Sequence, residues 1–169
     1  MRIIIVRHAI AMDRVQWARD HNTDHDRTLT AKGEERMRLG AAGLRKIVPQ
    51  VDYILTSRYN RAAGTARILH GSYPEAKLEE MHELEPGGDF DDLIDNVSQY
   101  APSSVIALVG HEPELSALMG RLLTGRNIPL GYLKKGAAVL ISFYSTPQRE
   151  RGNLEWSLPP LALRALSPE

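Results

Sequence analysis

The sequence predicts an α/β protein whose central sheet is mostly parallel. Short runs of β-branched and aliphatic residues, clearest at 3–6 and 105–109, are typical of buried strands. These runs alternate with longer helical segments, as in proteins whose helices pack on a parallel sheet. A chain of 169 residues is long enough for one sizeable core. We therefore expect residues 1–169 to form a single three-layer α/β/α domain.

The amino-terminal half contains three of the expected strands and two of the helices. Thr30 is expected to cap the first helix and Pro49 to stop it. Ser57 is expected to cap the second helix and Gly71 to end it. The expected order is a strand at 2–6, a polar loop with a turn of helix at 9–28, a helix between Thr30 and Pro49 with Met37, Leu39, Ala41, Leu44, Ile47 and Val48 on its apolar side, a strand at 52–56, a helix at 58–69 and a strand at 77–80.

The carboxy-terminal half continues the alternation and finishes with two strands. Turn-rich residues separate these last strands, so we expect them to pair as a hairpin. The expected order is a loop at 83–89, a helix at 90–100 followed by Pro102, a buried strand at 104–109, a helix from Pro113 to near Leu123, a loop at 125–136, strands at 137–143 and 154–158, and a surface tail from Pro159.

The composition excludes several classes of function. The 21 basic and 21 acidic residues give a formal net charge of zero, so no overall field favours nucleic acid or an anionic membrane. The absence of cysteine excludes a thiol nucleophile, a thiolate metal site and a disulfide framework. No apolar run approaches the roughly 20 residues that span a bilayer, and no signal-peptide pattern opens the chain. We expect a cytoplasmic protein that binds neither nucleic acid nor a membrane.

Histidine or arginine residues follow three of the expected strands, at the carboxyl end of each. The first strand is followed by Arg-His at 7–8, and a late strand by Gly-His at 110–111. The second strand leads through Thr-Ser-Arg at 56–58 into a helix that carries Arg61 in its first turn. Ligands of open α/β sheets bind beyond the carboxyl ends of the strands. If these strands are parallel and adjacent, two histidines and two or three arginines converge on one small volume.

Such a cluster suits a phosphoryl group. Guanidinium groups bind phosphate through a rigid fork of donors, and a helix amino terminus adds backbone N–H groups. Neighbouring positive charge lowers the pKa of a histidine, so one neutral imidazole can attack phosphorus. The other imidazole, when protonated, can stabilise oxygen charge or donate a proton to the leaving group. This chemistry needs no metal and no cofactor.

Each of these residues alone has a plainer explanation. A histidine at a strand end is usually a packed or surface residue, and Arg7 alone can be a salt-bridge partner. Arg58 and Arg61, taken singly, suit a solvated helix face. Only the occurrence of these histidines and arginines together, after three strands, favours a common binding or catalytic site.

That joint pattern resembles the histidine phosphatase superfamily, which has a phosphoglycerate mutase-like fold. The motifs occur in the family's order, as VRHA (6–9), TSRYNRAAGTA (56–66) and VGHEP (109–113). An Arg-His pair alone is a weak signal, whereas three motifs in order, each at a strand end, are a strong one. The similarity covers nearly the whole chain.

The resemblance assigns roles to four residues. It implies that His8 is the nucleophile and forms a phosphohistidine intermediate. Arg7 and Arg61 would bind the phosphoryl group, and His111 would be the second histidine of the pocket. All four are thus expected to be both catalytic and phosphate-binding.

Within the superfamily the chain resembles the small SixA-like phosphohistidine phosphatases. Its length fits a catalytic core without large insertions, and DRTLTAKG (26–33) and ELEPGGD (83–89) resemble two segments of that branch. Ala9 stands where the family more often has glycine. Ala11 and Arg14 replace the serine and asparagine that the family's mutases carry, which argues against a phosphoglycerate mutase.

The resemblance leaves open which residue protonates the leaving group. Glu83 and Glu85 are the candidates for a general acid, the alternative being surface carboxylates beside a helix. Arg58 stands where SixA-like proteins often have proline, so an extra cation can face the pocket. A phosphoramidate can take its proton directly on nitrogen, which makes a dedicated acid less necessary.

Three functions remain open. The first is a metal-independent phosphatase that acts on phosphohistidine in a partner protein, such as a histidine phosphotransfer domain. The second is the same chemistry on a small phosphate monoester, and the third is a non-catalytic phosphate-binding module. The 9–28 loop is the expected lid, and an open pocket would favour a protein substrate. The sequence specifies neither the oligomeric state nor the partner.

One segment mimics a metal site. HNTDHDR (21–27) places His21 and His25 four residues apart with carboxylates nearby. It lacks helical periodicity, however, so we interpret it as a solvated loop near the mouth of the pocket.

Overall fold

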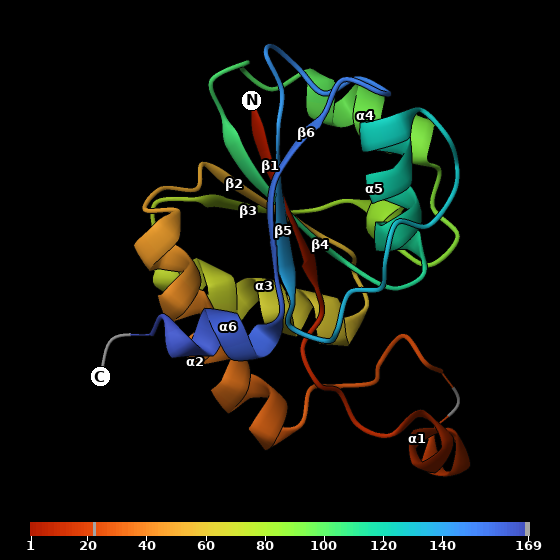
Figure 1. The fold of residues 1–169 in the computed structure, drawn as a ribbon. Coiled ribbons are helices and arrows are strands. Elements are labelled where there is room, and N and C mark those ends of the chain that lie inside the picture. Colours follow the sequence, from red (N-terminus) through yellow and green to blue (C-terminus); the bar gives the residue numbers. More distant parts are fainter. Residues whose placement is uncertain (22, 168–169) are drawn as a thin grey trace.

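A six-stranded sheet forms the centre of the computed structural model, which describes residues 1–21 and 23–167 (Figure 1). Its strands are β1 (Arg2–Arg7), β2 (Tyr53–Thr56), β3 (Lys77–Glu80), β4 (Val105–Gly110), β5 (Ala138–Ser142) and β6 (Asn153–Leu158). They lie side by side in the order β3-β2-β4-β1-β5-β6.

Strand pairing confirms both the mostly parallel sheet and the terminal hairpin. β1 pairs parallel with β4, and β2 pairs parallel with β3 and with β4. β5 pairs antiparallel with β1 and with β6. Because β2, β4 and β1 are adjacent and parallel, their carboxyl ends meet at one edge of the sheet.

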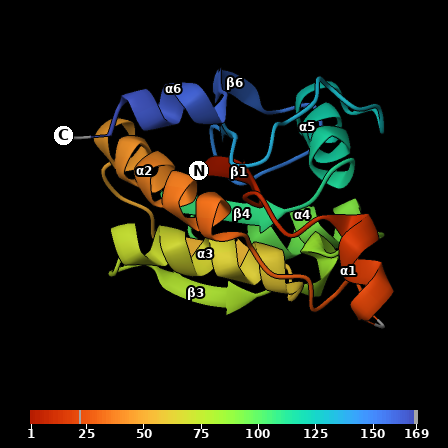
Figure 2. The same ribbon diagram turned by 90° about the horizontal axis from the view of Figure 1, so that it is seen from below.

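Helices cover both faces of the sheet and give the expected three layers. The helices α2 (Ala31–Ile47), α3 (Asn60–Ser72) and α6 (Pro160–Ala165) pack on one face. The other face is covered by α4 (Phe90–Ser98) and α5 (Glu114–Thr124) (Figures 1 and 2). None of the helices in the described ranges is both long and apolar enough to cross a membrane.

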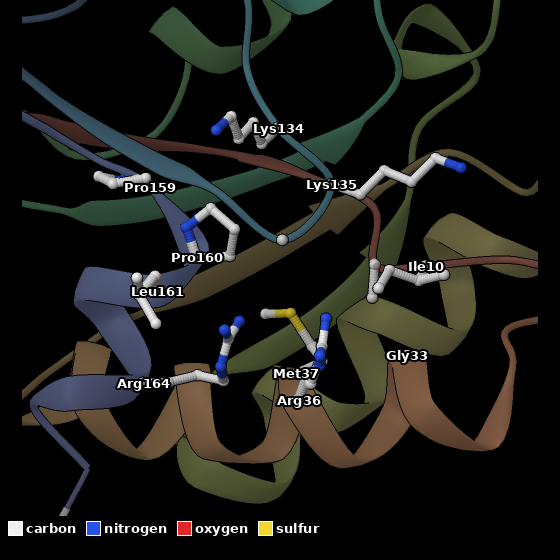
Figure 3. Close-up of a pocket in the computed structure, with 12 residues that line it drawn as sticks. Ile10, Gly33, Arg36, Met37, Lys134, Lys135, Pro159, Pro160, Leu161 and Arg164 are labelled. Atoms are coloured by element: carbon white, nitrogen blue, oxygen red, sulfur yellow. The ribbon is translucent and has the colours of Figure 1, made fainter.

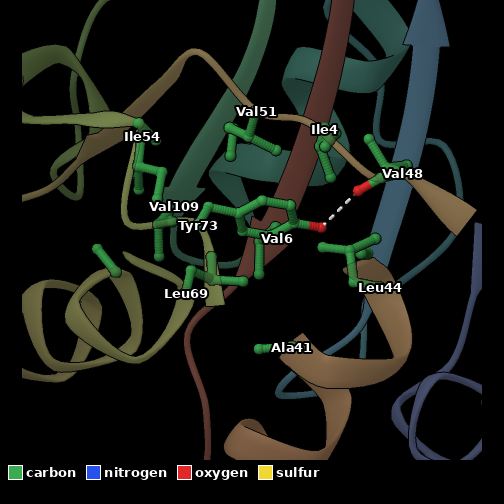
Figure 4. Close-up of a cluster of buried hydrophobic side chains, with 14 of the residues drawn as sticks. Ile4, Val6, Ala41, Leu44, Val48, Val51, Ile54, Leu69, Tyr73 and Val109 are labelled. Carbon is green, nitrogen blue, oxygen red and sulfur yellow. Dashed lines mark hydrogen bonds between the residues drawn. The ribbon is translucent and has the colours of Figure 1, made fainter. Parts of the chain in front are cut away.

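Side chains along β1 point alternately to the two faces of the sheet, and helices cover both faces. The strand is therefore apolar from Ile3 to Val6. Ile3 and Ile5 point into the core under α4 and α5, whereas Ile4 and Val6 point into the core under α2 and α3. Each buried aliphatic side chain stabilises the fold by about 1.5–3 kcal/mol relative to an exposed one. Figure 4 shows the core under α2 and α3. In this core the Tyr73 hydroxyl donates to the Val48 carbonyl oxygen at 2.9 Å.

The segment before α2 joins the 9–28 loop closely to that helix. Thr30 caps α2 as predicted, since its Oγ1 accepts a hydrogen bond from the Gly33 N–H at 3.0 Å. A Cβ at position 33 would lie 2.0 Å from the carbonyl oxygen of Ile10. Only glycine therefore lets the loop and the first turn of α2 approach so closely.

The carboxy-terminal tail lies on the surface as predicted, but it forms a helix, α6, that buries one residue against α2. Leu163 of α6 is buried, and a Cβ at Gly43 of α2 would lie 1.8 Å from its carbonyl oxygen. The close approach of α6 along Gly40 and Gly43 also corrects the predicted apolar side of α2. Leu39 is 44% exposed, because α6 packs on the glycine side of the helix; Ile47, also assigned to the apolar side, is 38% exposed.

The start of α3 and the segment at 82–84 differ from the prediction, whereas the turn of helix expected in the 9–28 loop is present. α3 begins at Asn60, because Ser57 makes no capping bond to it and instead contacts a histidine of the site. The helix ends at Ser72, one residue past Gly71. In the 9–28 loop, the expected turn of helix is α1 (Arg14–Asp20), which is capped by Asp13. The start of the predicted 83–89 loop is part of a short 3-10 helix, η1 (His82–Leu84).

Candidate active site

The ends of β1, β4 and β2 bring the predicted residues together. Arg7 and Gly110 are register partners in the parallel ladder, so the next residues, His8 and His111, leave the sheet side by side. Their ring centroids are 5.3 Å apart. Arg61 enters the same place from the first turn of α3, which follows β2.

These residues line a cavity of about 580 Å³. Arg7, His8, Arg61 and His111 are all buried, with at most 9% of each residue exposed. The 9–28 loop forms one wall of the cavity, and the start of α5 forms another. From these two walls come Met12, Asp13, Arg14, Asp24, Arg27, Glu112, Pro113 and Glu114.

Backbone contacts hold His8 in one position. Its N–H donates to the Gly110 carbonyl oxygen at 3.0 Å, and its carbonyl oxygen accepts from the Gly136 N–H at 3.2 Å. The next peptide is fixed as well, because the Ala9 N–H donates to Thr65 Oγ1 at 2.9 Å. The imidazole therefore projects from a rigid strand end.

The orientation of the His8 ring determines which nitrogen can react. Nδ1 lies 2.7 Å from the Ala9 carbonyl oxygen, and a carbonyl oxygen can only accept a hydrogen bond. Nδ1 therefore carries the proton, and in the neutral ring Nε2 keeps its lone pair. Burial, together with the charges of His111, Arg61 and Arg7, lowers the pKa of His8 to about 2. The ring is thus neutral near pH 7, with Nε2 free to act as a nucleophile.

His111 offers one nitrogen to a ligand. Its Nε2 lies 2.9 Å from Ser57 Oγ, while its buried Nδ1 has no hydrogen-bond partner in the part of the chain that the structure describes. Burial and the nearby Arg61 charge lower its pKa to about 3. The Tyr59 ring stands edge-on to the imidazole at 5.3 Å and restricts its rotation.

Both arginines are anchored through their terminal nitrogens. Arg7 NH1 donates to the Leu133 carbonyl oxygen at 2.6 Å. Arg61 NH1 donates to the Asp24 carbonyl oxygen at 2.9 Å, and its NH2 lies 3.0 Å from the Asp24 carboxylate. The Nε atom of each arginine is buried without a partner among the described residues.

Unpaired polar atoms mark the cavity as a binding site. Within residues 1–21 and 23–167, four buried side-chain atoms lack a hydrogen-bond partner: Arg7 Nε, Arg61 Nε, His111 Nδ1 and Glu114 Oε2. All four belong to residues that line this cavity. A buried group without a partner costs about 1–3 kcal/mol, so such groups are rare unless a ligand pairs with them. Three nitrogen atoms on three residues, two of them cationic, suit the oxygens of a phosphoryl group.

A family model agrees with this geometry. The model of the histidine phosphatase superfamily (branch 1) matches residues 3–115, which is more than half of the chain. The chain belongs to the histidine phosphatase superfamily. As a member of this superfamily, it is a phosphatase.

Relatives and solved structures extend the comparison. An uncharacterized protein of Picosynechococcus sp. is 35% identical over 117 residues, which cover 68% of each chain. The structure of the protein histidine phosphatase SixA complexed with tungstate is 23% identical, covers 96% of this chain and 99% of its own, and has a TM-score of 0.80. A phosphoserine phosphatase mutant from Entamoeba histolytica, in complex with phosphoserine, is 14% identical over 96% of this chain and 98% of its own, with a TM-score of 0.68. The fold of this histidine phosphatase is therefore SixA-like and phosphoglycerate mutase-like.

Arg27 and Asp24 of the histidine phosphatase cavity, like Glu114 at the start of α5, were not predicted from the sequence as site residues. Arg27 is buried and bonds to the Asp24 carboxylate at 2.8 Å and to the Met12 carbonyl oxygen at 2.9 Å. Burial opposes ionisation of Asp24, but the Arg27 hydrogen bond and the Arg61 and Arg27 charges lower its pKa. Arg27 could have been found through its place in DRTLTAKG, whereas Asp24 was interpreted only as part of the solvated segment 21–27. A bound phosphoryl group would compete with the Asp24 carboxylate for Arg61.

Three further candidates lie outside the lining of the cavity. Glu83 is buried and turned toward α4, where its Oε1 accepts from Asn96 Nδ2 at 2.7 Å. Glu85 Oε1 pairs with Arg58 Nε at 2.5 Å, so these two side chains neutralise each other. Neither glutamate is placed to protonate a leaving group, and Arg58 adds no cation to the cavity lining.

The segment 21–27 contributes Asp24 and Arg27 to the cavity wall. His21 stacks on Trp17, with ring centroids 3.6 Å apart, while His25 packs against Tyr59. Asn22, which also belongs to this segment, lies outside the described residues. In the part of the chain that the structure describes, no group of three or more His, Asp or Glu side chains could hold a metal ion.

Acid is expected to destabilise the fold through the two buried imidazoles. In the unfolded chain a histidine has a pKa of about 6.5, whereas His8 and His111 have folded pKa values of about 2 and about 3. Between these values the unfolded state binds more protons, so the free energy of unfolding falls as the pH falls. At about pH 5 the two groups together should cost about 4 kcal/mol relative to neutral pH.

Urea denaturation at about pH 7.5 and about pH 5, in a buffer without phosphate or sulfate, measures this effect. The His8→Ala variant should lose about 2 kcal/mol less than the wild type on acidification. His70→Ala, which removes a histidine of α3 outside the cavity, should behave as the wild type. An equal loss in the wild type and in His8→Ala would contradict the prediction.

Proposed function

We propose that this chain hydrolyses phosphohistidine on a partner protein through a covalent intermediate on His8. The observation that carries the proposal is the set of unpaired nitrogens on Arg7, Arg61 and His111, three residues that line one cavity together with a neutral His8. Such an arrangement can bind three phosphoryl oxygens while a nucleophile faces phosphorus.

The reaction proceeds in two displacements. His8 Nε2 attacks phosphorus and forms a P–N bond, while the bond from phosphorus to the substrate nitrogen breaks. The electron pair stays on that nitrogen, which takes a proton from the solvent. Water then attacks the phosphorus of phosphorylated His8, and the P–N bond breaks with its electron pair returning to Nε2. The product is inorganic phosphate, which keeps the protons of the water. Arg7 and Arg61 stabilise the equatorial charge in both steps.

Two observations support a phosphohistidine substrate. The SixA structure with a TM-score of 0.80 is named as a protein histidine phosphatase. In addition, an imidazole leaving group can take its proton directly on nitrogen, so its departure does not depend on a general acid of the cavity. Both points favour a phosphoramidate over a phosphate ester.

Small phosphate monoesters are the second candidate substrate. Their support comes from the phosphoserine complex among the similar structures and from one carboxylate in the cavity. Asp24 is paired with two arginines, Asp13 caps α1, and Glu112 accepts from Ser116 Oγ and the Leu133 N–H. Only Glu114 has a buried carboxylate oxygen without a partner among the described residues. It is therefore the carboxylate that could protonate an ester oxygen.

The Glu114→Gln variant tests this role. Removing a general acid should lower kcat about 10²-fold on an alkyl phosphate, whose leaving group needs a proton. The same variant should leave kcat on p-nitrophenyl phosphate nearly unchanged, because p-nitrophenolate leaves without protonation. Equal effects on both esters would show that Glu114 supports the structure of the site rather than proton transfer.

The proposed substrate is tested by phosphate release in the presence of EDTA. The substrates are a histidine phosphotransfer domain phosphorylated on its histidine and a panel of small phosphomonoesters, each assayed with the wild type and with His8→Ala. Release from the protein alone, lost in the variant, is the expected result. Preference for a small ester would indicate that the same mechanism acts on the second candidate substrate, a small phosphate monoester. Phosphate binding without turnover of any substrate would indicate a binding module.

A further inference from the structure

A second cavity, of about 210 Å³, opens beside the active site. It lies between α2, α6 and the 125–136 loop (Figure 3). Its floor is apolar and includes Ile10 and Met37, and the exposed Leu161 also lines it. We call it the basic cleft and define it by the four cationic residues of its lining, which are Arg36, Lys134, Lys135 and Arg164.

Backbone hydrogen bonds fix the basic cleft next to His8. The Gly136 N–H donates to the carbonyl oxygens of Arg7 at 3.1 Å and of His8 at 3.2 Å. The two lysines of the cleft directly precede Gly136, so they are held beside the strand end that carries the histidine. Lys135 lines both the basic cleft and the active-site cavity. The two cavities are therefore neighbours, with a shared cation between them.

The charge of the basic cleft is uncompensated. Among the described residues that line it, there is no aspartate or glutamate. No ion pair links any of its four cations to another described residue. This contrasts with the whole chain, whose 21 basic and 21 acidic residues balance. The cleft is thus a local positive surface on a neutral protein.

The arrangement of the cations indicates the kind of ligand. Arg36 and Arg164 extend from two different helices toward the loop that carries Lys134 and Lys135 (Figure 3). A single phosphate group is best bound by donors that converge on one point, as in the active-site cavity. Cations distributed around an apolar floor instead suit several carboxylates that flank an apolar side chain. That pattern is typical of an acidic polypeptide segment.

We propose that the basic cleft binds an acidic segment of the protein substrate, close to its phosphohistidine. This inference rests on the proposed phosphohistidine phosphatase function and adds a sequence preference to it. Each exposed ion pair contributes little alone, but several act together in affinity and in the rate of encounter. The preference should therefore be sensitive to salt.

Two synthetic peptides test the inference, each with one phosphohistidine. Aspartate and glutamate flank it in one peptide, and asparagine and glutamine replace them in the other. The wild type should hydrolyse the acidic peptide with a kcat/KM roughly tenfold higher, through a lower KM. The Arg36→Glu/Arg164→Glu variant should lose this preference while keeping its activity on the neutral peptide. The control Arg126→Glu/Arg151→Glu makes the same change in charge at exposed positions outside both cavities, and it should keep the preference.

The outcomes separate the two proposals. Equal hydrolysis of both peptides by the wild type would overturn the role of the basic cleft and leave the phosphohistidine phosphatase function intact. So would a preference that survives in Arg36→Glu/Arg164→Glu. Hydrolysis of p-nitrophenyl phosphate but of neither peptide would overturn the proposed function and, with it, the role of the cleft.

Discussion

Replacing His8 with alanine is expected to lower kcat by at least about 10⁴-fold, on a phosphohistidine protein and on p-nitrophenyl phosphate alike. The reason is geometric. The Ala9 carbonyl oxygen orients Nδ1, burial keeps the ring neutral, and Nε2 is left as the reacting atom. Without His8, water would have to attack phosphorus directly, and the site would accelerate that reaction far less.

The control for this variant is binding. His8→Ala should still bind inorganic phosphate, because Arg7, Arg61 and His111 remain, and its urea midpoint near pH 7 should stay close to that of the wild type. His70→Ala provides the matched histidine substitution and should keep full activity. More than about 1% residual activity in His8→Ala would contradict a nucleophilic role.

Replacing Arg61 with alanine is expected to cause the second largest loss, about 10³-fold in kcat/KM. The guanidinium is buried at the cavity wall, and its Nε has no partner among the described residues. Its removal takes away transition-state stabilisation and also releases Asp24, whose carboxylate then faces the phosphoryl group without a counter-charge. Both effects disfavour a phosphoryl group that gains negative charge on its oxygens.

Steady-state kinetics of Arg61→Ala, Arg61→Lys and Arg67→Ala measure this loss. Arg67 lies exposed on the same helix outside the active-site cavity, so its replacement should change kcat/KM less than twofold. Lysine at position 61 keeps the charge but not the fork, and it should restore only part of the activity. A loss below about tenfold in Arg61→Ala would exclude direct contact with the phosphoryl group.

The sheet and the convergence of the strand ends could be predicted because they depend on local patterns. A run of four aliphatic residues at 3–6 identifies the central strand, and adjacent parallel strands place their carboxyl ends at one edge. The four residues expected at that edge all line the cavity. Their catalytic roles stay predictions until the variants are measured.

Contacts made by loops and glycines could not be predicted in the same way. The 9–28 loop has no periodicity, so the pairing of Asp24 with Arg61 depends on tertiary geometry alone. Arg58 and Glu85 neutralise each other across 27 positions of sequence, which no local pattern indicates. On α2, Leu39 looked like a core residue, but close packing of α6 selects Gly40 and Gly43 instead.

The most direct test of the account is to trap the intermediate. The wild type is mixed with radiolabelled phosphoprotein substrate and quenched within one turnover into alkali, where phosphohistidine is stable and phosphoserine esters are not. Peptide mapping should place the label on His8, as an acid-labile phosphoramidate, and His8→Ala should carry none. A label on another residue, or turnover without any labelled enzyme, would contradict the covalent mechanism.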